Sequence, residues 1–314
     1  MRLVFCGTPR FAVPTLKALL DAGHEVSLVL TQPDRPVGRR QEVEPTPVKQ
    51  VALAAGLDVT QPEKIRNNAE FRASLEAIGP DAIVVVAYGR IISPWMLALP
   101  RLGCINLHGS LLPKYRGAAP IQWAVAMGET VTGNTTMLLE EGLDTGPILL
   151  QEEIVVGPEQ TAADLFEVLA KRGAPLVVKT LAGLADGSVW PKVQDPARAT
   201  LAPLLQRDDG RMNFAAHTAT ELKNRWRGFQ PWPGAFTLLD GKKLIVHRMG
   251  VADTTHATGS AQPGEVHVDE KHLLVCCADD TWLELLEVQL EGKKRMPAVV
   301  FLRGIQLASG TKLG

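Results

Sequence analysis

An unbroken apolar run at residues 82–89, AIVVVAYG, constrains the fold of this chain more than any other feature. A strand with one solvent-exposed face alternates apolar and polar residues. This run is rich in valine and has no such alternation, so both of its faces are expected to be covered. The segments around it alternate strand and helix signals, with strands at 2–8, 25–32 and 103–108 and helices at 11–22 and 48–55. The first part of the chain is therefore predicted to be an α/β domain, an open and mostly parallel sheet with helices on both faces.

The sequence changes in character after residue 185. Residues 190–206 lie in a mostly polar, proline-containing stretch, which favours an extended linker between two domains at 1–189 and 207–314. One helix is expected near 215–227, and short strands separated by turns then predict a small β-barrel or sandwich. A further helix at 161–185 is predicted to break or kink at its glycine and proline.

Composition limits the function more loosely. Of the 314 residues, 46% are hydrophobic and 21% charged, so a packed globular protein is expected. No apolar run approaches the roughly 18 residues that a membrane helix needs, so no membrane partner is predicted. The four cysteines form no metal-type pair, and a reducing cytoplasm is the expected location. A net charge of −1 argues against a surface coated in positive charge, but not against a local basic patch.

Two polar side chains, Asn106 and His108, stand at the end of the strand predicted at 103–108. They share one face of that strand because side chains alternate, and they lie at its carboxyl end, where ligands bind in open α/β sheets. An amide and an imidazole can both donate to the oxygen of a carbonyl that becomes a tetrahedral oxyanion, and histidine can also move a proton near neutral pH.

A histidine in such a role needs a carboxylate, and Asp144 in the glycine-flanked turn EEGLDTGP is the candidate. Alternatives remain open on residue type alone. Both polar residues also suit a solvated strand end or a bond to turn backbone. A zinc site from Cys104, His108 and Asp144 lacks close-spaced ligand pairs, so no metal is predicted. The absence of a G-x-S-x-G elbow argues against a serine hydrolase.

The segments NLHGSLLPKYRGAAPIQWA and EEGLDTGPIL resemble the folate-dependent formyltransferases. FCGTPRFAVPTLKALLDAGHEV, VLTQPDRPVGR, TPVKQVA, VVVAYGRIIS, PWPGAF and GKKRMPAVVFLRG resemble those members of the family that act on charged initiator tRNA. This resemblance covers nearly the whole chain. It implies a Rossmann-like catalytic domain followed by an OB-like, tRNA-binding barrel.

The resemblance also implies the reaction. The formyl group of 10-formyltetrahydrofolate would pass directly to the α-amino group of methionine on initiator methionyl-tRNA, without metal or covalent enzyme intermediate. Asn106, His108 and Asp144 match the family's catalytic trio. The folate cosubstrate is expected to contact two segments. They are Ala87, Tyr88 and Gly89, and Ser110, Leu111, Leu112 and Pro113.

The tRNA is expected to meet an arginine-bearing loop, because arginine binds phosphate bidentately and stacks on unpaired bases. Arg39 matches the key arginine of the family's loop, with Arg35 and Arg40 beside it. Lys242 and Lys243 are further candidates in the second domain, for which simple solvent exposure is the competing interpretation. Residues 207–314 carry nearly balanced charge, so any footprint must come from clustering.

Two other functions stay open at this point. One is formyl transfer to a small amine such as a nucleotide amino sugar or glycinamide ribotide, and the other is inactive RNA or folate binding. The intact GLDTG element, the arginine loop and the long C-terminal part favour tRNA. Asn134 and Thr136 depart from the family's usual apolar residues in a strand near the site. The sequence demands nothing larger than a monomer.

Overall fold

The computed structural model describes residues 1–37, 42–252, 261–305 and 307–314, which form two compact units. Unit 1 comprises residues 1–120, 131–155 and 164–203, and unit 2 the remaining segments, 121–130, 156–163 and 204–314. Residues 190–203 of the predicted linker are thus part of unit 1. In the described residues, no helix is both long enough and apolar enough to cross a lipid bilayer.

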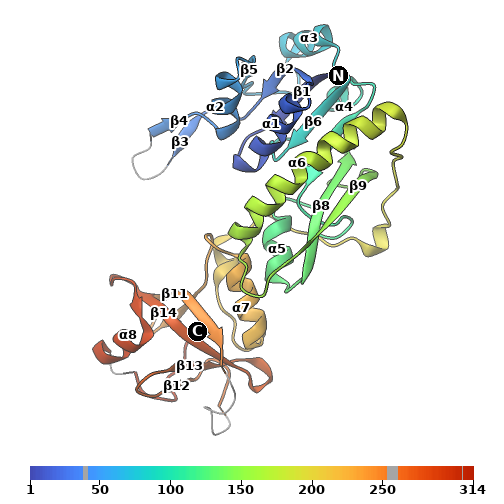
Figure 1. The fold of residues 1–314 in the computed structure, drawn as a ribbon. Helices are drawn as coiled ribbons and strands as arrows, with labels where there is room; N and C mark the ends of the chain where they lie inside the picture. The colour runs from blue at the N-terminus through green and yellow to red at the C-terminus, as the bar shows by residue number, and fades with distance from the viewer. Residues whose placement is uncertain (38–41, 253–260, 306) are drawn as a thin grey trace. The chain divides into compact units, whose positions relative to one another are not determined.

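Unit 1 is built on a seven-stranded sheet (Figure 1). Its strands, in spatial order, are β5 (Val59–Thr60), β2 (Glu25–Leu30), β1 (Arg2–Gly7), β6 (Ala82–Val86), β7 (Cys104–His108), β8 (Val131–Leu138) and β9 (Ile148–Val155). The strands from β5 to β7 pair in parallel, and β8 and β9 add antiparallel pairs. The strand order reverses at β1, which has β2 on one side and β6 on the other. The predicted mostly parallel sheet is confirmed.

Helices cover both faces of this sheet, as the apolar β6 predicted. On one face, α3 (Ala69–Ile78) and α4 (Pro94–Leu97) pack over alternate residues of β1, β6 and β7. On the other lies α6 (Ala162–Asp186), where a Cβ on Gly173 would come within 2.6 Å of Leu107. The helix runs on through Pro175, so the predicted break is absent. The remaining helices of unit 1 are η1 (Arg10–Ala12), α1 (Val13–Asp21), α2 (Pro47–Ala54) and η2 (Pro196–Arg198).

Unit 2 contains an antiparallel sheet that curls into a half-barrel. Its strands run in the order β10 (Phe236–Leu239), β11 (Lys242–Val251), β14 (Trp282–Leu290), β13 (Leu273–Cys276) and β12 (Val266–Val268), with β15 (Met296–Pro297) paired to β14. The C-terminal residues link the two edges. Leu313 donates to Gly264 beside β12, and Gly314 donates to Leu238 in β10. The predicted barrel-like second domain is confirmed.

Two helices from distant parts of the chain meet in unit 2, α7 (Ala219–Gly228) and α5 (Pro120–Ala126), most of which belongs to this unit. The other helices in the described residues of unit 2 are η3 (Arg207–Gly210), η5 (Ala278–Asp280) and α8 (Ala298–Gly304). Gly228 of α7 packs so closely on α5 that a Cβ there would lie 2.7 Å from that of Ala126. Figure 1 shows these two helices side by side.

Candidate active site

The carboxyl end of β7 carries Asn106 and His108 on the same face of the sheet. In the antiparallel register with β8, Asn106 lies opposite Met137 and His108 lies opposite Thr135. Cys104 shares this face, but its thiol is buried in the core beneath α4, where burial raises its pKa to about 12. Both polar residues therefore lie just past the end of this core, and the thiol below them is structural.

The two ring nitrogens of His108 have different partners. Nε2 lies 2.9 Å from the backbone oxygen of Tyr115, and only a protonated Nε2 can bond to an oxygen that accepts. In the neutral ring, Nδ1 therefore carries the lone pair, and it lies 3.7 Å from Oδ2 of Asp144. Because His108 is only 6% exposed, little water screens the interaction between this imidazole and the carboxylate.

Asp144 is held in place by backbone contacts on both sides of its turn. Its Oδ2 accepts a hydrogen bond of 2.8 Å from the backbone N–H of Gly117, in the loop that follows β7. Its φ is +50°, in the left-handed region. Two residues on, a Cβ at Gly146 would lie 1.8 Å from the backbone oxygen of Leu138, so only glycine fits there. The turn thus holds the carboxylate facing His108.

The predicted folate segment 110–113 is stabilised from below by β8 and β9. The hydroxyl of Thr135 donates to the backbone oxygen of Ser110 and accepts from the backbone N–H of Leu112, at 2.7 and 3.1 Å. Gln151 donates to the same hydroxyl and to the backbone oxygen of Leu112. Ser110 and Leu112 are buried, and Leu111 and Pro113 are partly exposed. The segment is a fixed turn beside His108.

The second predicted folate segment, 87–89, follows β6. Ala87 has a φ of +45°, and both Ala87 and Gly89 are exposed. The ring of Tyr88 is buried in the core, and its backbone oxygen accepts hydrogen bonds from Thr8 and Gln32. Burial raises the pKa of the Tyr88 hydroxyl. Tyr88 thus anchors this loop, and its two neighbours form the exposed surface.

Left-handed backbone at residues other than glycine gathers around this end of the sheet. In the described part of unit 1, the only residues with positive φ other than glycine, asparagine and aspartate are Ala87 and Tyr115. Side chains with a Cβ strain the chain in this region, and such residues cluster at functional sites. Ala87 follows β6, and Tyr115 supplies the backbone oxygen that His108 binds. Asp144 also has a positive φ.

Residues 190–203 pack on the site instead of extending away from it. Arg116 donates its backbone N–H to Thr200 and accepts one from Ala202, at 2.8 and 2.7 Å. Gln194 is 5% exposed, and its amide group bonds to the Asp144 turn and to the Arg116 guanidinium. This segment therefore joins the loop after β7 to the turn after β8.

The predicted arginine loop follows β2 as a hairpin, β3 (Arg35–Val37) and β4 (Glu42–Glu44). Arg35 is exposed and pairs across the hairpin with Glu44. Arg39 and Arg40 lie outside the described residues. Asp34, Lys49 and Gln61 form a polar cluster at the base of the hairpin.

The contacts in this cluster favour the charged form of Asp34. Partial burial alone would raise the pKa of Asp34, but hydrogen bonds from Lys49 and Gln61 outweigh it and lower the pKa. Gln61 also donates to the backbone oxygen of Gln32 at 2.7 Å. Both ends of the hairpin are thus fixed to the sheet.

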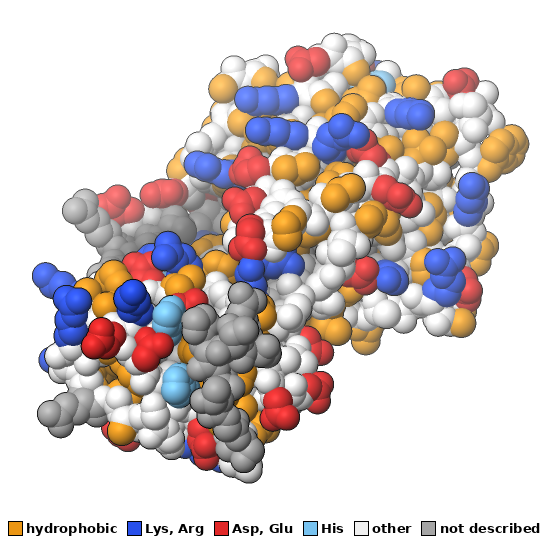
Figure 2. Space-filling model, turned by 60° about the horizontal axis from the view of Figure 1, so that its bottom comes forward, with side chains coloured by type: hydrophobic (Ala, Val, Ile, Leu, Met, Phe, Trp, Pro, Cys, Tyr) orange, Lys and Arg blue, Asp and Glu red, His pale blue; other side chains and the backbone are white. Residues whose placement is uncertain are grey.

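The basic side chains of unit 2 include the candidates Lys242 and Lys243 and a second group on α7. Lys242 is exposed, and the Lys243 ammonium lies 3.8 Å from the centre of the Phe236 ring. On α7 the basic side chains are occupied within the unit. Lys223 pairs with Glu159, Arg225 lies over the Phe229 ring, and Arg227 donates to Gly157 and Gln160. On the face drawn in Figure 2, basic and acidic side chains of the described residues are mixed, with no broad field of one sign among them.

Asn134 and Thr136 point to the other face of β8, toward α6. The Asn134 amide donates to the backbone oxygen of Leu169, and the Thr136 hydroxyl lies 2.8 Å from that of Thr180. Both are fully buried. Their polarity therefore serves the contact between helix and sheet, and the odd-numbered neighbours on β8 face the site.

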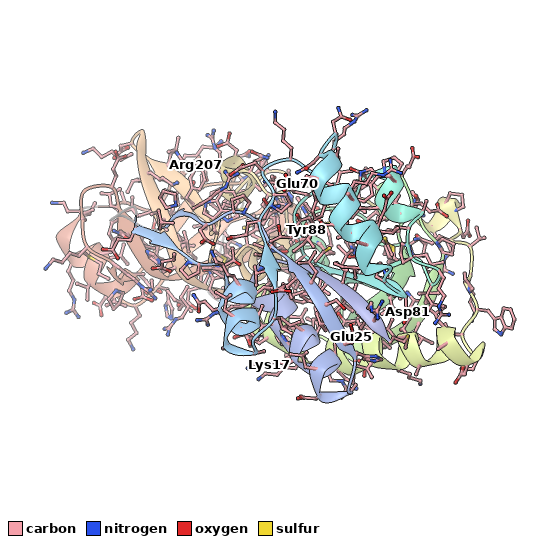
Figure 3. All side chains as sticks on the ribbon, turned by 90° about the horizontal axis from the view of Figure 1, so that it is seen from above. Lys17, Glu25, Glu70, Asp81, Tyr88 and Arg207 are labelled. Atoms are coloured by element: carbon pink, nitrogen blue, oxygen red, sulfur yellow. The ribbon has the colours of Figure 1, made fainter. Side chains whose placement is uncertain are left out.

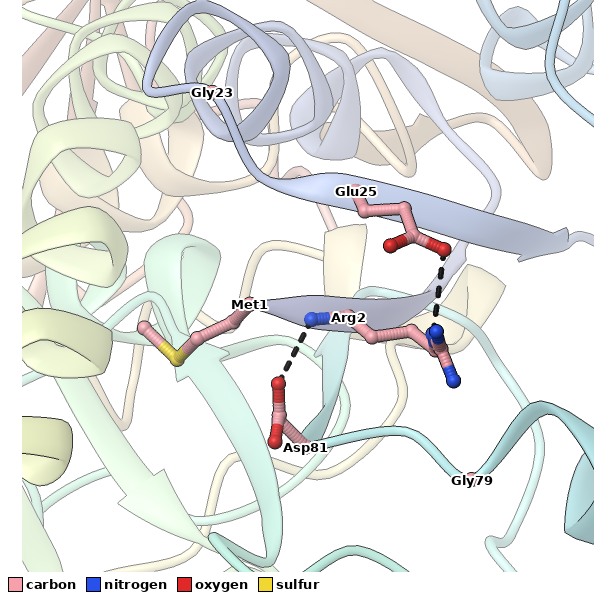
Figure 4. Close-up of a pocket in the computed structure, with 6 residues that line it drawn as sticks. All are labelled: Met1, Arg2, Gly23, Glu25, Gly79 and Asp81. Carbon is pink, nitrogen blue, oxygen red and sulfur yellow. Dashed lines mark hydrogen bonds and ion pairs between the residues drawn. The ribbon is translucent and has the colours of Figure 1, made fainter.

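A pocket of about 480 Å³ lies at the opposite end of the parallel strands, among Met1, Arg2, Gly23, Glu25, Gly79 and Asp81 (Figure 4). In Figure 3, Asp81 and Glu25 lie together, and Tyr88 lies at a distance from them on unit 1. Asp81 and Glu25 stand at the starts of β6 and β2, whereas Tyr88 follows the end of β6. This pocket is therefore separate from the site around His108.

Sequence reasoning missed several groups that hold the site. Thr135 carried a usable signal, because strand alternation places it opposite His108. The backbone oxygen of Tyr115 and the N–H of Gly117 leave no trace in residue type. Gln194 lies in a polar stretch with no periodicity, and its role depends on tertiary packing.

Family models match both parts of the chain. One described as formyl transferase matches residues 1–181, and one described as formyl transferase, C-terminal domain, matches residues 204–306. Among curated proteins, methionyl-tRNA formyltransferase of Acidobacterium capsulatum is 66% identical over 314 residues, covering all of both chains. The protein of that name from Koribacter versatilis is 56% identical, covering all of this chain and 99% of its own.

Solved structures share the fold at low identity. The sugar 3N-formyl transferase WlaRD, solved with dTDP and 5-N-formyl-THF, has a TM-score of 0.66 at 18% identity, covering 94% of this chain and 99% of its own. HypX from Aquifex aeolicus, in complex with tetrahydrofolic acid, has a TM-score of 0.59 at 17% identity, covering 96% of this chain and 47% of its own. With both parts of the chain matched by family models and relatives similar over their full length, the chain belongs to the formyl transferase family.

Proposed function

We propose that this chain transfers the formyl group of 10-formyltetrahydrofolate to the α-amino group of methionine on initiator methionyl-tRNA, for translation initiation. The observation that carries the proposal is full-length similarity to methionyl-tRNA formyltransferases, at 66% and 56% identity, in a chain whose imidazole and carboxylate meet at one end of the sheet. Two of the similar solved structures, WlaRD with 5-N-formyl-THF and HypX with tetrahydrofolic acid, support a folate cosubstrate.

The geometry supports direct transfer. The neutral α-amine attacks the formyl carbon, and the negative charge that develops on the formyl oxygen is stabilised by donors at the end of β7. The amide of Asn106 supplies one donor. His108 supplies the other from Nδ1 when protonated, because Tyr115 already occupies Nε2. Asp144 stabilises the imidazolium, at 3.7 Å in the structure. The carbonyl then re-forms as the bond from the formyl carbon to N10 breaks, and the proton lost by the amine passes to N10, which leaves as part of tetrahydrofolate.

The folate is assigned to the two turns beside this trio. Residues 110–113 form a turn fixed by Thr135, and Ala87 and Gly89 are exposed in the loop after β6. Backbone amides and carbonyls can pair with the edge of a pterin, while Leu111 offers an apolar surface. The acceptor end of the tRNA is assigned to the β3–β4 hairpin and its loop, with Arg35, Arg39 and Arg40. The body of the tRNA is assigned to Lys242 and Lys243.

Acceptor competition tests the proposal. The protein is incubated with 10-formyltetrahydrofolate and either charged initiator methionyl-tRNA, a nucleotide amino sugar or glycinamide ribotide, and formylated product is quantified. Formylation of methionyl-tRNA with little product from the small amines is expected. Formyl transfer only to a small amine would refute the tRNA assignment while leaving the family intact, and transfer to none would refute the activity.

A further inference from the structure

We infer that Gln194, in the segment after β9 and α6, is a positioning residue for formyl transfer that acts on the reaction through Asp144. This inference rests on the proposed function for the site. The residue touches none of the reacting groups assigned above. It lies between the two loops that bring His108 and Asp144 together.

The side-chain amide of Gln194 has all of its hydrogen-bonding capacity engaged. Nε2 donates to the backbone oxygens of Asp144 and Gly146, at 2.8 and 2.7 Å. Oε1 accepts from Nε and Nη2 of Arg116, at 3.1 and 2.8 Å. An amide offers two donor hydrogens and one oxygen with two lone pairs, so no capacity is left over. At 5% exposure, water does not replace these bonds.

The placement of these bonds matters because of what they connect. Two of them hold the turn whose Asp144 has left-handed backbone, and such a conformation persists only when its surroundings fix it. The other two hold Arg116, next to the Gly117 N–H that binds the Asp144 carboxylate. Gln194 thus fixes Asp144 twice, through its own backbone and through the loop that grips its carboxylate.

The backbone around Gln194 is fixed independently. Lys192 exchanges two hydrogen bonds of 2.8 Å with Ile148 at the start of β9. On the other side, Thr200 donates its N–H to Pro113 and accepts that of Arg116. The segment therefore remains docked when only the amide side chain is altered, and the consequence of such a change falls on the Asp144 turn.

A cycle of substitutions tests the inference. Gln194→Leu removes all four bonds, and we expect kcat for methionyl-tRNA formylation to fall about 100-fold, the scale of a misplacement of roughly 1 Å. KM for 10-formyltetrahydrofolate and for methionyl-tRNA should stay within about twofold, because neither substrate is assigned a contact with this residue. In an Asp144→Asn background, Gln194→Leu should lower the single-turnover rate of formylation by less than about threefold, because the carboxylate through which Gln194 acts is already lost.

Two further variants make the result decisive. Gln194→Glu keeps an acceptor for Arg116 but can no longer donate to the Asp144 turn, so its kcat should fall nearly as far as that of Gln194→Leu. It provides the test if the leucine variant fails to fold. Asp195→Ala removes the cap of η2, where the carboxylate accepts from Ala197, and should leave kcat unchanged. Equal losses from Gln194→Leu in both backgrounds, or full activity of both Gln194 variants, would overturn the inference.

Failure of the proposed function gives a different pattern. If the wild-type protein formylates a small amine in place of methionyl-tRNA, the same cycle is run with that acceptor, and the expected non-additivity with Asp144 is unchanged. If the wild-type protein formylates methionyl-tRNA and the cycle is additive, only the role of Gln194 is refuted.

Discussion

The two ends of the parallel sheet in unit 1 carry polar clusters of opposite character. At the amino end, Arg2, Glu25, Asp81 and Arg101 form ion pairs around an open pocket, with side chains 27–65% exposed. At the carboxyl end, His108 is 6% and Asp144 15% exposed, and the carboxylate has a backbone N–H aimed at it. The pocket of about 480 Å³ lies at the end without the trio.

The two clusters therefore differ in burial and in how firmly their groups are held. Exposed pairs are screened by water and hold their partners weakly. Groups withdrawn from water act strongly on a developing charge and need no rearrangement when it appears. Strained backbone at Ala87, Tyr115 and Asp144 also gathers at the carboxyl end.

Removing the imidazole should produce the largest difference between the two ends. We expect His108→Ala to lower kcat by about 10³-fold, within the range for losing a general acid–base group, with the far-UV circular dichroism spectrum unchanged. Steady-state and single-turnover formylation measure the effect. The matched change at the amino end, Asp81→Ala, should leave kcat within about twofold. Comparable losses from both variants would remove the functional distinction between the ends.

Two neighbours on β8 test whether the distinction also holds across the faces of the sheet. Thr135→Val leaves the Leu112 N–H and the Ser110 oxygen without their partner, so KM for the folate should rise about tenfold. Thr136→Val instead loses the hydrogen bond to the Thr180 hydroxyl of α6 and the one from the Leu150 N–H of β9. It should lower the free energy of unfolding by about 1–2 kcal/mol with KM unchanged.

Folate titration and urea unfolding of both threonine variants give the two measurements. A reversal of the pattern, with the folate effect in Thr136→Val, would show that the site lies on the face of α6. Similar effects from both would show that the strand responds as a whole.

The β3–β4 hairpin follows β2 at the carboxyl end of the sheet, and its arginines are the residues proposed to bind the tRNA. Arg39→Ala should raise KM for methionyl-tRNA about fivefold, and the slope of log KM against log salt should become shallower by about one, as expected for one lost phosphate contact. The dissociation constant for folate should not change. Arg101→Ala, which removes an arginine at the amino end, is the control. A matching effect from Arg101→Ala would indicate general charge attraction.

The fold was predictable from the sequence because it depends on periodicity. The apolar run at β6 requires helices on both faces, and alternation places Asn106 and His108 together at one end of β7. The approach of Asp144 was inferred from turn chemistry and carboxyl-end geometry. The sequence predicted a break or kink at Gly173 and Pro175, and the break is wrong, because packing of α6 against β7 and β8 overrides a local breaker.

Other parts of the site have no local signature. The tautomer of His108 is set by the Tyr115 oxygen, a backbone group seven residues away. Gln194 lies 50 residues from Asp144 and reaches it because residues 190–203 fold back on unit 1. Polar stretches with proline are typical of linkers, and only the docked structure reveals that this one holds the site.

The smallest effect is expected where the amino-end cluster contributes to stability. A hydrogen bond from the backbone N–H of Arg2, with further help from Arg101, lowers the pKa of Asp81. A carboxyl whose pKa is lowered by folding stabilises the folded state above its unfolded pKa of roughly 3.9, and that contribution is lost as the pH falls through the lower, folded value. Asp81→Asn should therefore lower the free energy of unfolding by about 0.5 kcal/mol at pH 7, since the group is partly exposed and screened.

The same variant carries its own internal control. As the pH falls below about 4, the difference in unfolding free energy between Asp81→Asn and the wild-type protein should shrink, because the wild-type carboxyl also becomes neutral. Urea unfolding from pH 7 to pH 3 measures it, and kcat should be unaffected throughout the range where the protein is folded. A difference that grows with acidification would mean that the neutral Asp81 is the stabilising form. A loss of kcat would mean that the amino end communicates with His108 across the sheet, contrary to its exposed and weakly held geometry.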